Sequence, residues 1–391
     1  MIDLPRLRAG IPALTNSIYL NTGTFGPMPT VVADEIRRAY GEIEQQGTFS
    51  PAIFWQMELE GFEVVRGLVA ALLHAQAAEI ALTRNVTDGL NIVLHGLDWQ
   101  AGDEVILTDH EHPSGTVPWL ALAERAGVQL RWLELVDDAD EIVARFERLL
   151  GPRTRLAQLS HVSCLTGLRL PIERLCALAR QAGVLTLVDG AHAEGQFAVD
   201  VAALGCDFYA ACGHKWLLGP QGIGMLFVRE DLVERLRPMW LGWDVAQPFD
   251  RVNRSYQLQS TAARFEQSTR AWPLYLAFGK AVEHIEGFGL AAIEARVHAL
   301  RRQFIADLDA IPGVTVLSPV DPSLGTGLVT VRLAGWPFDL LQQRLWEEHR
   351  IITNVIREFD ALRFSLAFFT SQAELDITLE AMNAASSQRS Q

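Results

Sequence analysis

Lysine is nearly absent from this chain, which makes the two lysines that remain candidates for chemistry. Of 33 basic residues only Lys215 and Lys280 are lysine, and the others are arginine. A lysine amine can form an imine with a carbonyl compound, whereas arginine stays protonated and cannot. Lys280 lies in YLAFGKAVEHI, whose amphipathic helical spacing predicts a solvated position. Lys215 lies in GHKWLLGPQGIG, between strand-like segments, so we expect the chemistry there.

Asp189 is a second candidate, because it directly follows the apolar run at residues 184–188 in VDGAHAEG. A carboxylate buried at a strand end needs a partner. The protonated nitrogen of a pyridine ring would be such a partner, and the pairing would keep the ring a strong electron sink. A helix N-cap or a buried salt bridge explains Asp189 equally well at this point.

Two further segments could hold an anion and a flat ring. In TRNVTDGLNIVLHGL a turn leads into a helix near Thr87 and Asp88, and helix amides with a hydroxyl bind anions. Thr87 as a plain N-cap is the alternative, and Asp88 should point away from an anion. In LTDHEHPSG, His112 offers a ring that can stack on a heterocycle, unless it is simply a satisfied polar residue. The amine, the carboxylate, the anion site and the ring form a consistent set.

Apolar runs and helical patterns alternate through the middle of the chain, and their order predicts how the candidates are positioned. Near-continuous apolar strands between helices indicate a mainly parallel sheet covered on both faces, with ligands beyond the carboxyl ends of the strands. After about residue 269 the pattern changes to a long helix at 291–311 and then strands and helices of a smaller α+β domain. The predicted strands of the first part are 104–108, 130–135, 156–160, 184–188, 208–211 and 223–228, with helices at 115–126, 139–150 and 172–182.

Composition excludes several classes of function. The formal net charge is −14 and no long basic run occurs, so nucleic acid and anionic membranes are not expected as partners. The four cysteines form neither a CxxC pair nor a disulfide framework, and no metal site is expected. The amino terminus has no apolar signal region, and no apolar run reaches the roughly 18 residues of a membrane span. A soluble, cytoplasmic protein is the expectation, with a frayed polar end at residues 386–391.

The order NVTDG, EHP, SH, DGAH, GHK and RFEQST resembles the class V aminotransferase branch of the fold-type I pyridoxal-phosphate (PLP) enzymes. That branch includes cysteine desulfurases, selenocysteine lyases, cystine C–S lyases and isopenicillin N epimerase. The resemblance covers nearly the whole chain, and GLDWQAGDEVILTDHEHP, GPRTRLAQLSH and WLGW are most similar to the C–S lyase and epimerase-like members. It implies an α/β fold with a mainly parallel seven-stranded sheet covered by helices. It also implies a large PLP-binding domain at residues 21–284 and a small domain at 1–20 and 285–391.

The resemblance also implies roles for individual residues. Lys215 would hold pyridoxal 5'-phosphate as a Schiff base, and Asp189 would pair with the pyridine nitrogen. Arg363, in LRFSLAFF, would grip the substrate carboxylate, which suits a guanidinium fork; an internal ion pair is the alternative. The other implied contacts are His112 stacked on the ring, His192 near the phenolic oxygen, Val86, Thr87 and His214 at the phosphate, Asn21 at the substrate, and Ser268 and Thr269 at the phosphate of the second subunit of a homodimer.

Departures from the family pattern bear on the reaction. Cysteine desulfurases carry a catalytic cysteine shortly before the final arginine, but NVIREFDAL at residues 354–362 has none. Cys164 stands near where desulfurases have an asparagine, and Cys212 where a serine or threonine meets the phosphate. Both thiols are expected to be buried and inert, a reactive Cys164 being the alternative. Asn354 replaces an arginine of the desulfurases.

The leading hypothesis is therefore a C–S or C–Se lyase that acts on cysteine, cystine or a related S-substituted amino acid. Cysteine desulfurase-like, epimerase or aminotransferase activity on another amino acid is the alternative, since all share removal of the Cα proton. A binding protein that kept the fold is a third possibility, against which the retention of Lys215 argues. A nicotinamide dehydrogenase is excluded because no GxGxxG follows the first strands.

Overall fold

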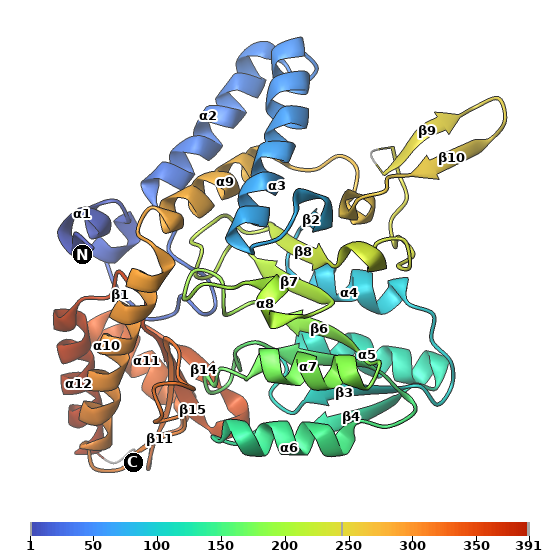
Figure 1. Ribbon diagram of the computed structural model, residues 1–391. Helices are drawn as coiled ribbons and strands as arrows, with labels where there is room; N and C mark the ends of the chain where they lie inside the picture. Colours follow the sequence, from blue (N-terminus) through green and yellow to red (C-terminus); the bar gives the residue numbers. More distant parts are fainter. Residues whose placement is uncertain (1, 244, 389–391) are drawn as a thin grey trace.

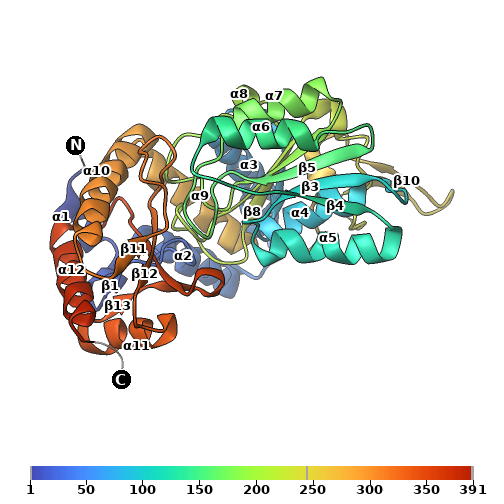
Figure 2. The ribbon, with the colours of Figure 1, turned by 90° about the horizontal axis from the view of Figure 1, so that it is seen from below.

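A computed structural model describes residues 2–243 and 245–388 of the chain. A large α/β region lies around one central sheet, and a smaller region contains α10, α11 and α12 (Figures 1 and 2). Helix α12 ends at Ser386, and residues 389–391 of the expected frayed end lie outside the described residues. No helix of the described part is long and apolar enough to cross a bilayer.

The central sheet has seven strands in the order β2-β8-β7-β6-β5-β3-β4. Strand β8 is antiparallel to both of its neighbours, and the other pairs are parallel. The predicted mainly parallel seven-stranded sheet is thus confirmed. The strands are β2 Ile80–Thr83, which the sequence analysis did not predict, β3 Glu104–Thr108, β4 Gln129–Leu133, β5 Thr154–Ser160, β6 Leu185–Asp189, β7 Phe208–Cys212 and β8 Gly224–Val228.

Helices cover both faces of this sheet, as the apolar strands require. One face packs against α3, α6, α7 and α9, and the other packs against α4 and α5. Adjacent strand residues such as Leu187 and Val188 belong to different faces, as the pleat dictates. The helices of this region are α2 Thr30–Gln46, α3 Gly61–Leu72, α4 Val86–Gly96, α5 Pro113–Ala126, α6 Ala139–Leu149, α7 Ile172–Gln181, α8 Val201–Leu204 and α9 Trp272–Glu286.

The smaller region is an antiparallel sheet with helices on it, in agreement with the expected α+β pattern. Its sheet has the order β11-β12-β15-β14. The predicted helix at 291–311 is α10 Leu290–Asp309. The other elements are β11 Val314–Val316, β12 Leu328–Leu333, α11 Phe338–His349, β13 Ile351–Ile352, β14 Asn354–Ile356, β15 Ala361–Ser365 and α12 Gln372–Ser386.

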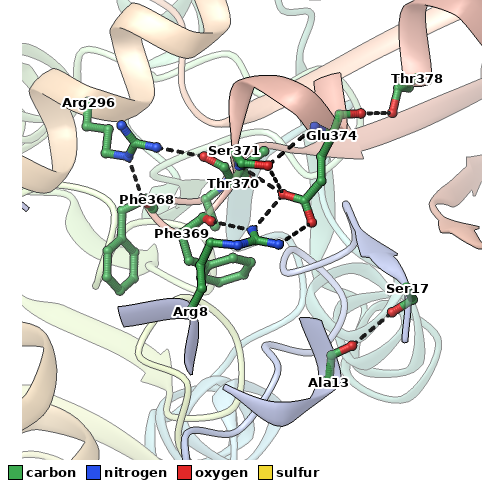
Figure 3. Close-up of polar contacts among 11 residues, drawn as sticks. Arg8, Ala13, Ser17, Arg296, Phe368, Phe369, Thr370, Ser371, Glu374 and Thr378 are labelled. Carbon is green, nitrogen blue, oxygen red and sulfur yellow. Dashed lines mark hydrogen bonds and ion pairs between the residues drawn. The ribbon is translucent and has the colours of Figure 1, made fainter. Parts of the chain in front are cut away.

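The amino-terminal segment contacts the smaller region. Strand β1 Ile18–Tyr19 pairs in parallel with β13. From α1 Leu4–Ala9, Arg8 makes a two-pronged ion pair with Glu374 of α12, with N–O distances of 2.7 and 2.8 Å (Figure 3). Ser371 caps α12 and donates its hydroxyl to the same carboxylate. The division at residues 20 and 284 remains a proposal that these contacts support.

A β-hairpin and a pair of helices project from the large region. The hairpin consists of β9 Ala246–Asp250 and β10 Ser255–Leu258, and it extends away from the central sheet (Figure 1). Helices α2 and α3 project in another direction. Exposed aromatic side chains gather on these projections, including Phe49, Trp55, Trp243, Phe249 and Tyr256.

Candidate active site

A cavity of ≈ 430 Å³ lies at the carboxyl edge of the sheet. The loops after β3, β6 and β7 and the amino end of α4 line one side. Residues 23–25 of the amino-terminal segment and residues 354–358 with Arg363 of the smaller region line the rest. Eight of the predicted site residues meet there: Val86, Thr87, His112, Asp189, His192, His214, Lys215 and Arg363.

Lys215 lies just beyond β7, and its amine faces into this cavity. Its Nζ lies 3.2 Å from His192 Nε2, and no carboxylate of the described residues lies within ion-pair distance. The amino-terminal segment packs directly on the lysine loop, since a Cβ on Gly26 would come within 2.1 Å of the Lys215 carbonyl oxygen. In contrast, Lys280 pairs with Glu283 on the exposed face of α9 at 2.7 Å. Lys215 therefore lines the cavity, whereas Lys280 lies on the surface.

Asp189 ends β6 and is buried at 6 % exposure. One carboxylate oxygen accepts from the backbone N–H of Ala191 at 2.9 Å. Neither alternative from the sequence is observed, because Asp189 opens no helix and has no salt bridge within the described part of the chain. Burial raises the pKa of Asp189, partly offset by Ala191 and the charge of Lys215. A cationic ligand atom at this carboxylate would relieve that cost of burial.

Glu111 is a buried carboxylate that the sequence analysis passed over, although it stands in the EHP motif. It accepts from Thr108 Oγ1 at 2.7 Å and from both the N–H and the hydroxyl of Ser160 at 2.9 Å. Burial first, and the charge of Asp189 second, raise its pKa to about 7. A carboxylate three residues beyond the end of the fully buried strand β3 was the signal that could have identified it. Its contacts join the ends of β3 and β5 beside His112.

The amino end of α4 offers an anion site, but its cap differs from the expectation. Asn85, not Thr87, is the N-cap, and its side chain accepts from Asp88 N–H at 2.8 Å. The helix begins at Val86, so Thr87 already lies in the first turn, where amides have no intrahelical partner. Asp88 pairs with Arg84 at 2.7 Å and does not line the cavity, as predicted.

His214 lies on the same side of the cavity, with its ring 5.3 Å from that of Phe25. Its Nδ1 is buried without a hydrogen-bond partner among the described residues. Burial and the charge of Lys215 lower the pKa of His214 to about 4. The ring is therefore neutral and can donate one hydrogen bond to a ligand.

A hydrogen bond from the first turn of α5 orients the ring of His112. This residue is the N-cap of α5, and its Nδ1 accepts from Ser114 N–H at 3.1 Å. The cap leaves the ring at the wall of the cavity, so the polar role and a stacking role are compatible. Burial lowers the pKa of His112, and the charges of Lys215 and Arg363 lower it further.

Arg363, on β15, is a buried cation without a carboxylate partner. It is 3 % exposed, donates through Nη1 to the Cys164 carbonyl and reaches Thr24 Oγ1 at 3.4 Å. Its Nε has no partner, and no acidic side chain in the described ranges pairs with it. The expected alternative of an internal ion pair is therefore not observed. A ligand carboxylate would complete this site.

The two cysteines at the cavity are both buried, as expected. Cys164 is 7 % exposed and Cys212 is 4 % exposed. Burial raises the pKa of Cys164 to about 11 and that of Cys212 to about 12. Both thiols are protonated at neutral pH, which makes them poor nucleophiles.

Three predicted residues do not line this cavity. Asn21 accepts from Thr24 Oγ1 at 2.7 Å, so it holds the residue that contacts Arg363. Ser268 and Thr269 line a neighbouring cavity of ≈ 380 Å³, which shares Asn85 with the first. Within a single chain the structure therefore does not bring these two residues to Lys215.

The donors and acceptors of the cavity fit PLP. An amine for its aldehyde, a buried carboxylate for its pyridine nitrogen and a flat ring are present on three neighbouring loops. The free amides of α4 and the unpartnered Nδ1 of His214 supply donors for a phosphate. These features define a PLP-dependent enzyme of the α/β class.

Comparisons with known proteins identify the family. The model of the class-V aminotransferases matches residues 18–377. Isopenicillin N epimerase of Streptomyces clavuligerus is 34% identical over 94% of both chains, and a cysteine desulfurase of Enterobacter sp. (strain 638) is 33% identical over 80% of this chain and 79% of that protein. A structure of the cystine C–S lyase C-DES with its product cysteine persulfide has a TM-score of 0.89 at 30% identity, over 95% of this chain and 99% of that chain. The chain belongs to the class-V aminotransferase family.

Proposed function

We propose that the protein is a C–S lyase that acts on cysteine, cystine or a related S-substituted amino acid. The observation that carries the proposal is the absence of a thiol from residues 354–362, the segment before Arg363 whose first part lines the cavity. Persulfide transfer needs a thiolate nucleophile, and the two thiols at the cavity, Cys164 and Cys212, are buried and protonated. The similarity to C-DES over nearly the whole of both chains also supports a lyase.

The side chains divide the work of this reaction. Arg363 binds the α-carboxylate of the substrate and fixes the direction of Cα, while Lys215 would hold PLP through its amine. The Lys215 amine is also the base that takes the Cα proton. When bound, PLP accepts the electron pair released at Cα. Asp189 would pair with the pyridine nitrogen through its carboxylate and so maintain that capacity.

The bond changes balance without an added oxidant. The Cα–H proton passes to Lys215 Nζ, the Cβ–S bond breaks, and sulfur leaves with the bonding electrons. The released 2-aminoacrylate reacts with water to give pyruvate and ammonia. From cystine the leaving group is cysteine persulfide, and from cysteine it is sulfide.

Product analysis tests the proposal. PLP-loaded protein is incubated with L-cysteine and L-cystine, and pyruvate, alanine and released sulfur are measured. We expect pyruvate in equal amount to the sulfur released. Alanine with sulfur would contradict the lyase assignment and establish desulfuration.

Epimerisation is the second candidate, because the epimerase of Streptomyces clavuligerus matches the chain along its length. Without a leaving group at Cβ, return of a proton to the other face of Cα inverts the centre. Exchange of the Cα hydrogen in deuterated water, with inversion and without pyruvate, would favour this activity. Exchange with pyruvate formation supports the lyase.

Substrate binding should depend on Arg363. We expect Arg363→Gln to raise KM about 10²-fold, the cost of a lost charge-assisted contact to a carboxylate. The KM of Arg363→Lys should lie between those of the parent and Arg363→Gln, because the point charge of an ammonium cannot reproduce the two-pronged contact of a guanidinium. Arg296, which donates to the carbonyls of Phe368 and Thr370 outside the cavity (Figure 3), provides the control Arg296→Gln. An unchanged KM for Arg363→Gln would remove Arg363 from the substrate site.

We also propose a cytoplasmic homodimer. Thr269 has φ 56, a conformation that costs a β-branched residue about 1–3 kcal/mol and marks functional segments. A second copy would use Ser268 and Thr269 at the phosphate and would cover the aromatic side chains on the projections. The free, buried cysteines suit a reducing compartment. A monomer in sedimentation experiments on the PLP-loaded protein would refute the dimer.

A further inference from the structure

His192 is held by a donor that fixes where its proton lies. The indole Nε1 of Trp216 lies 3.3 Å from His192 Nδ1, and both residues are buried, at 3 % and 4 % exposure. Because an indole N–H can only donate, Nδ1 must accept. A neutral imidazole carries one proton, which therefore lies on Nε2.

The surroundings keep this ring neutral. Burial lowers the pKa of His192 well below its ordinary value, and the charge of Arg363 acts in the same direction. Protonation of Nδ1 would also set two N–H groups against each other at the Trp216 contact. His192 thus stays in the Nε2–H form over the neutral pH range.

The fixed proton points at the reacting lysine. His192 Nε2 lies 3.2 Å from Lys215 Nζ. An Nε2–H group can donate to an unprotonated Nζ or to an oxygen, but an ammonium has no lone pair to accept it. The ring therefore presents a donor, not a base, to whatever is bonded to Lys215.

Two glycines pack closely against Trp216, one on its backbone and one on its ring. A Cβ on Gly195 would lie 2.5 Å from the Trp216 carbonyl, and a Cβ on Gly327 would lie 3.0 Å from the edge of its ring. Gln196 connects the segment of His192 to that of Gly327 by hydrogen bonds. Its amide nitrogen donates to the His192 carbonyl, and its oxygen accepts from Gly327 N–H at 2.8 Å. The smaller region thereby helps to hold the indole against His192.

We propose that Trp216 is a positioning residue that locks the tautomer of His192, so that His192 always donates a hydrogen bond toward Lys215 and the phenolic oxygen of its cofactor. The inference rests on the proposed function in one respect, that Lys215 carries PLP. It does not depend on whether the reaction is elimination or epimerisation.

Nitrogen NMR of histidine-labelled protein tests the tautomer directly, in the PLP-loaded enzyme and after removal of PLP. The His192 signals are assigned with His192→Gln. In the parent protein we expect an unprotonated Nδ1 and a protonated Nε2. In Trp216→Phe we expect the ratio of the two tautomers to fall about 5-fold or more, the equivalent of one ordinary hydrogen bond.

A double-substitution cycle separates positioning from packing. A glutamine amide carries its own N–H₂ donor, so Trp216→Phe should slow the parent about 5-fold but change the rate of His192→Gln little. Trp99→Phe is the matched control, since that indole donates to the Leu94 carbonyl at 2.7 Å, outside the cavity. It should leave the His192 signals unchanged.

Two results would overturn the inference. One is a His192 tautomer that is the same in Trp216→Phe and in the parent. The other is a rate loss from Trp216→Phe that is as large in the His192→Gln background as in the parent. Failure of the proposed function is recognised separately, because PLP would then not be bonded to Lys215 while the signals of the PLP-free protein could still be read.

Discussion

Replacement of Lys215 by alanine is expected to abolish the covalent attachment of PLP and to slow turnover by about 10⁴-fold or more, since one amine both carries the cofactor and moves the Cα proton. The geometry leaves no substitute: the other lysine of the chain pairs with Glu283 on the surface. His192, the ring nearest to Nζ, is held as a donor. Borohydride reduction followed by peptide mass spectrometry measures the attachment.

Because the chain has only two lysines, the variant Lys280→Ala is a control for the borohydride experiment. Lys280→Ala removes the only other lysine of the sequence, so every reducible bond to a lysine in that variant must be at Lys215. We expect full attachment and normal turnover in Lys280→Ala and neither in Lys215→Ala. A cofactor that borohydride still fixes to Lys215→Ala would contradict the assignment.

Most strands of the sheet could be predicted because they are buried on both faces, whereas the edge strand β4 is partly exposed and the buried edge strand β2 was not predicted. Strands β3, β6 and β7 are near-continuous apolar runs, and polar residues at their carboxyl ends mark where a ligand binds. Asp189, His112 and Lys215 could therefore be placed without coordinates. The local sequence was enough to predict these three residues, because each lies within a few residues of the end of a strand.

Contacts between distant segments could not be predicted in the same way. Thr24 and Phe25 line the cavity because their segment pairs with β13 of the smaller region and, through Gly26 N–H, with the His214 carbonyl. Trp216 is adjacent to Lys215 in the sequence, but its bond to His192 depends on the packing of Gly195 and Gly327. The sequence analysis suggested Thr87 as the N-cap of α4, which is wrong. Asn85 and Thr87 are both favourable N-cap residues, and only the structure shows that Asn85 has the extended backbone.

Loss of the Asp189 charge should have the second-largest effect. We expect Asp189→Ala to retain some PLP but to lose about 10³-fold in rate, because a buried cation left without its carboxylate costs several kcal/mol. Asp189→Asn distinguishes charge from shape. Its amide oxygen can still accept from Ala191 N–H, as the carboxylate does, yet it carries no negative charge. A rate for Asp189→Asn near that of Asp189→Ala would identify the charge as the part that matters.

A second buried aspartate shows whether such losses reflect damage to the sheet. Asp207 accepts from Thr186 N–H at 2.7 Å and pairs with Arg229, and it does not line the cavity. Asp207→Asn should therefore lower the melting temperature while leaving the rate per folded enzyme near the parent value. Asp189→Asn should raise the melting temperature of the PLP-free protein and lower the rate, because it removes a buried charge that Ala191 N–H and Lys215 offset only in part. Near-normal turnover in Asp189→Asn would refute the pairing with the pyridine nitrogen.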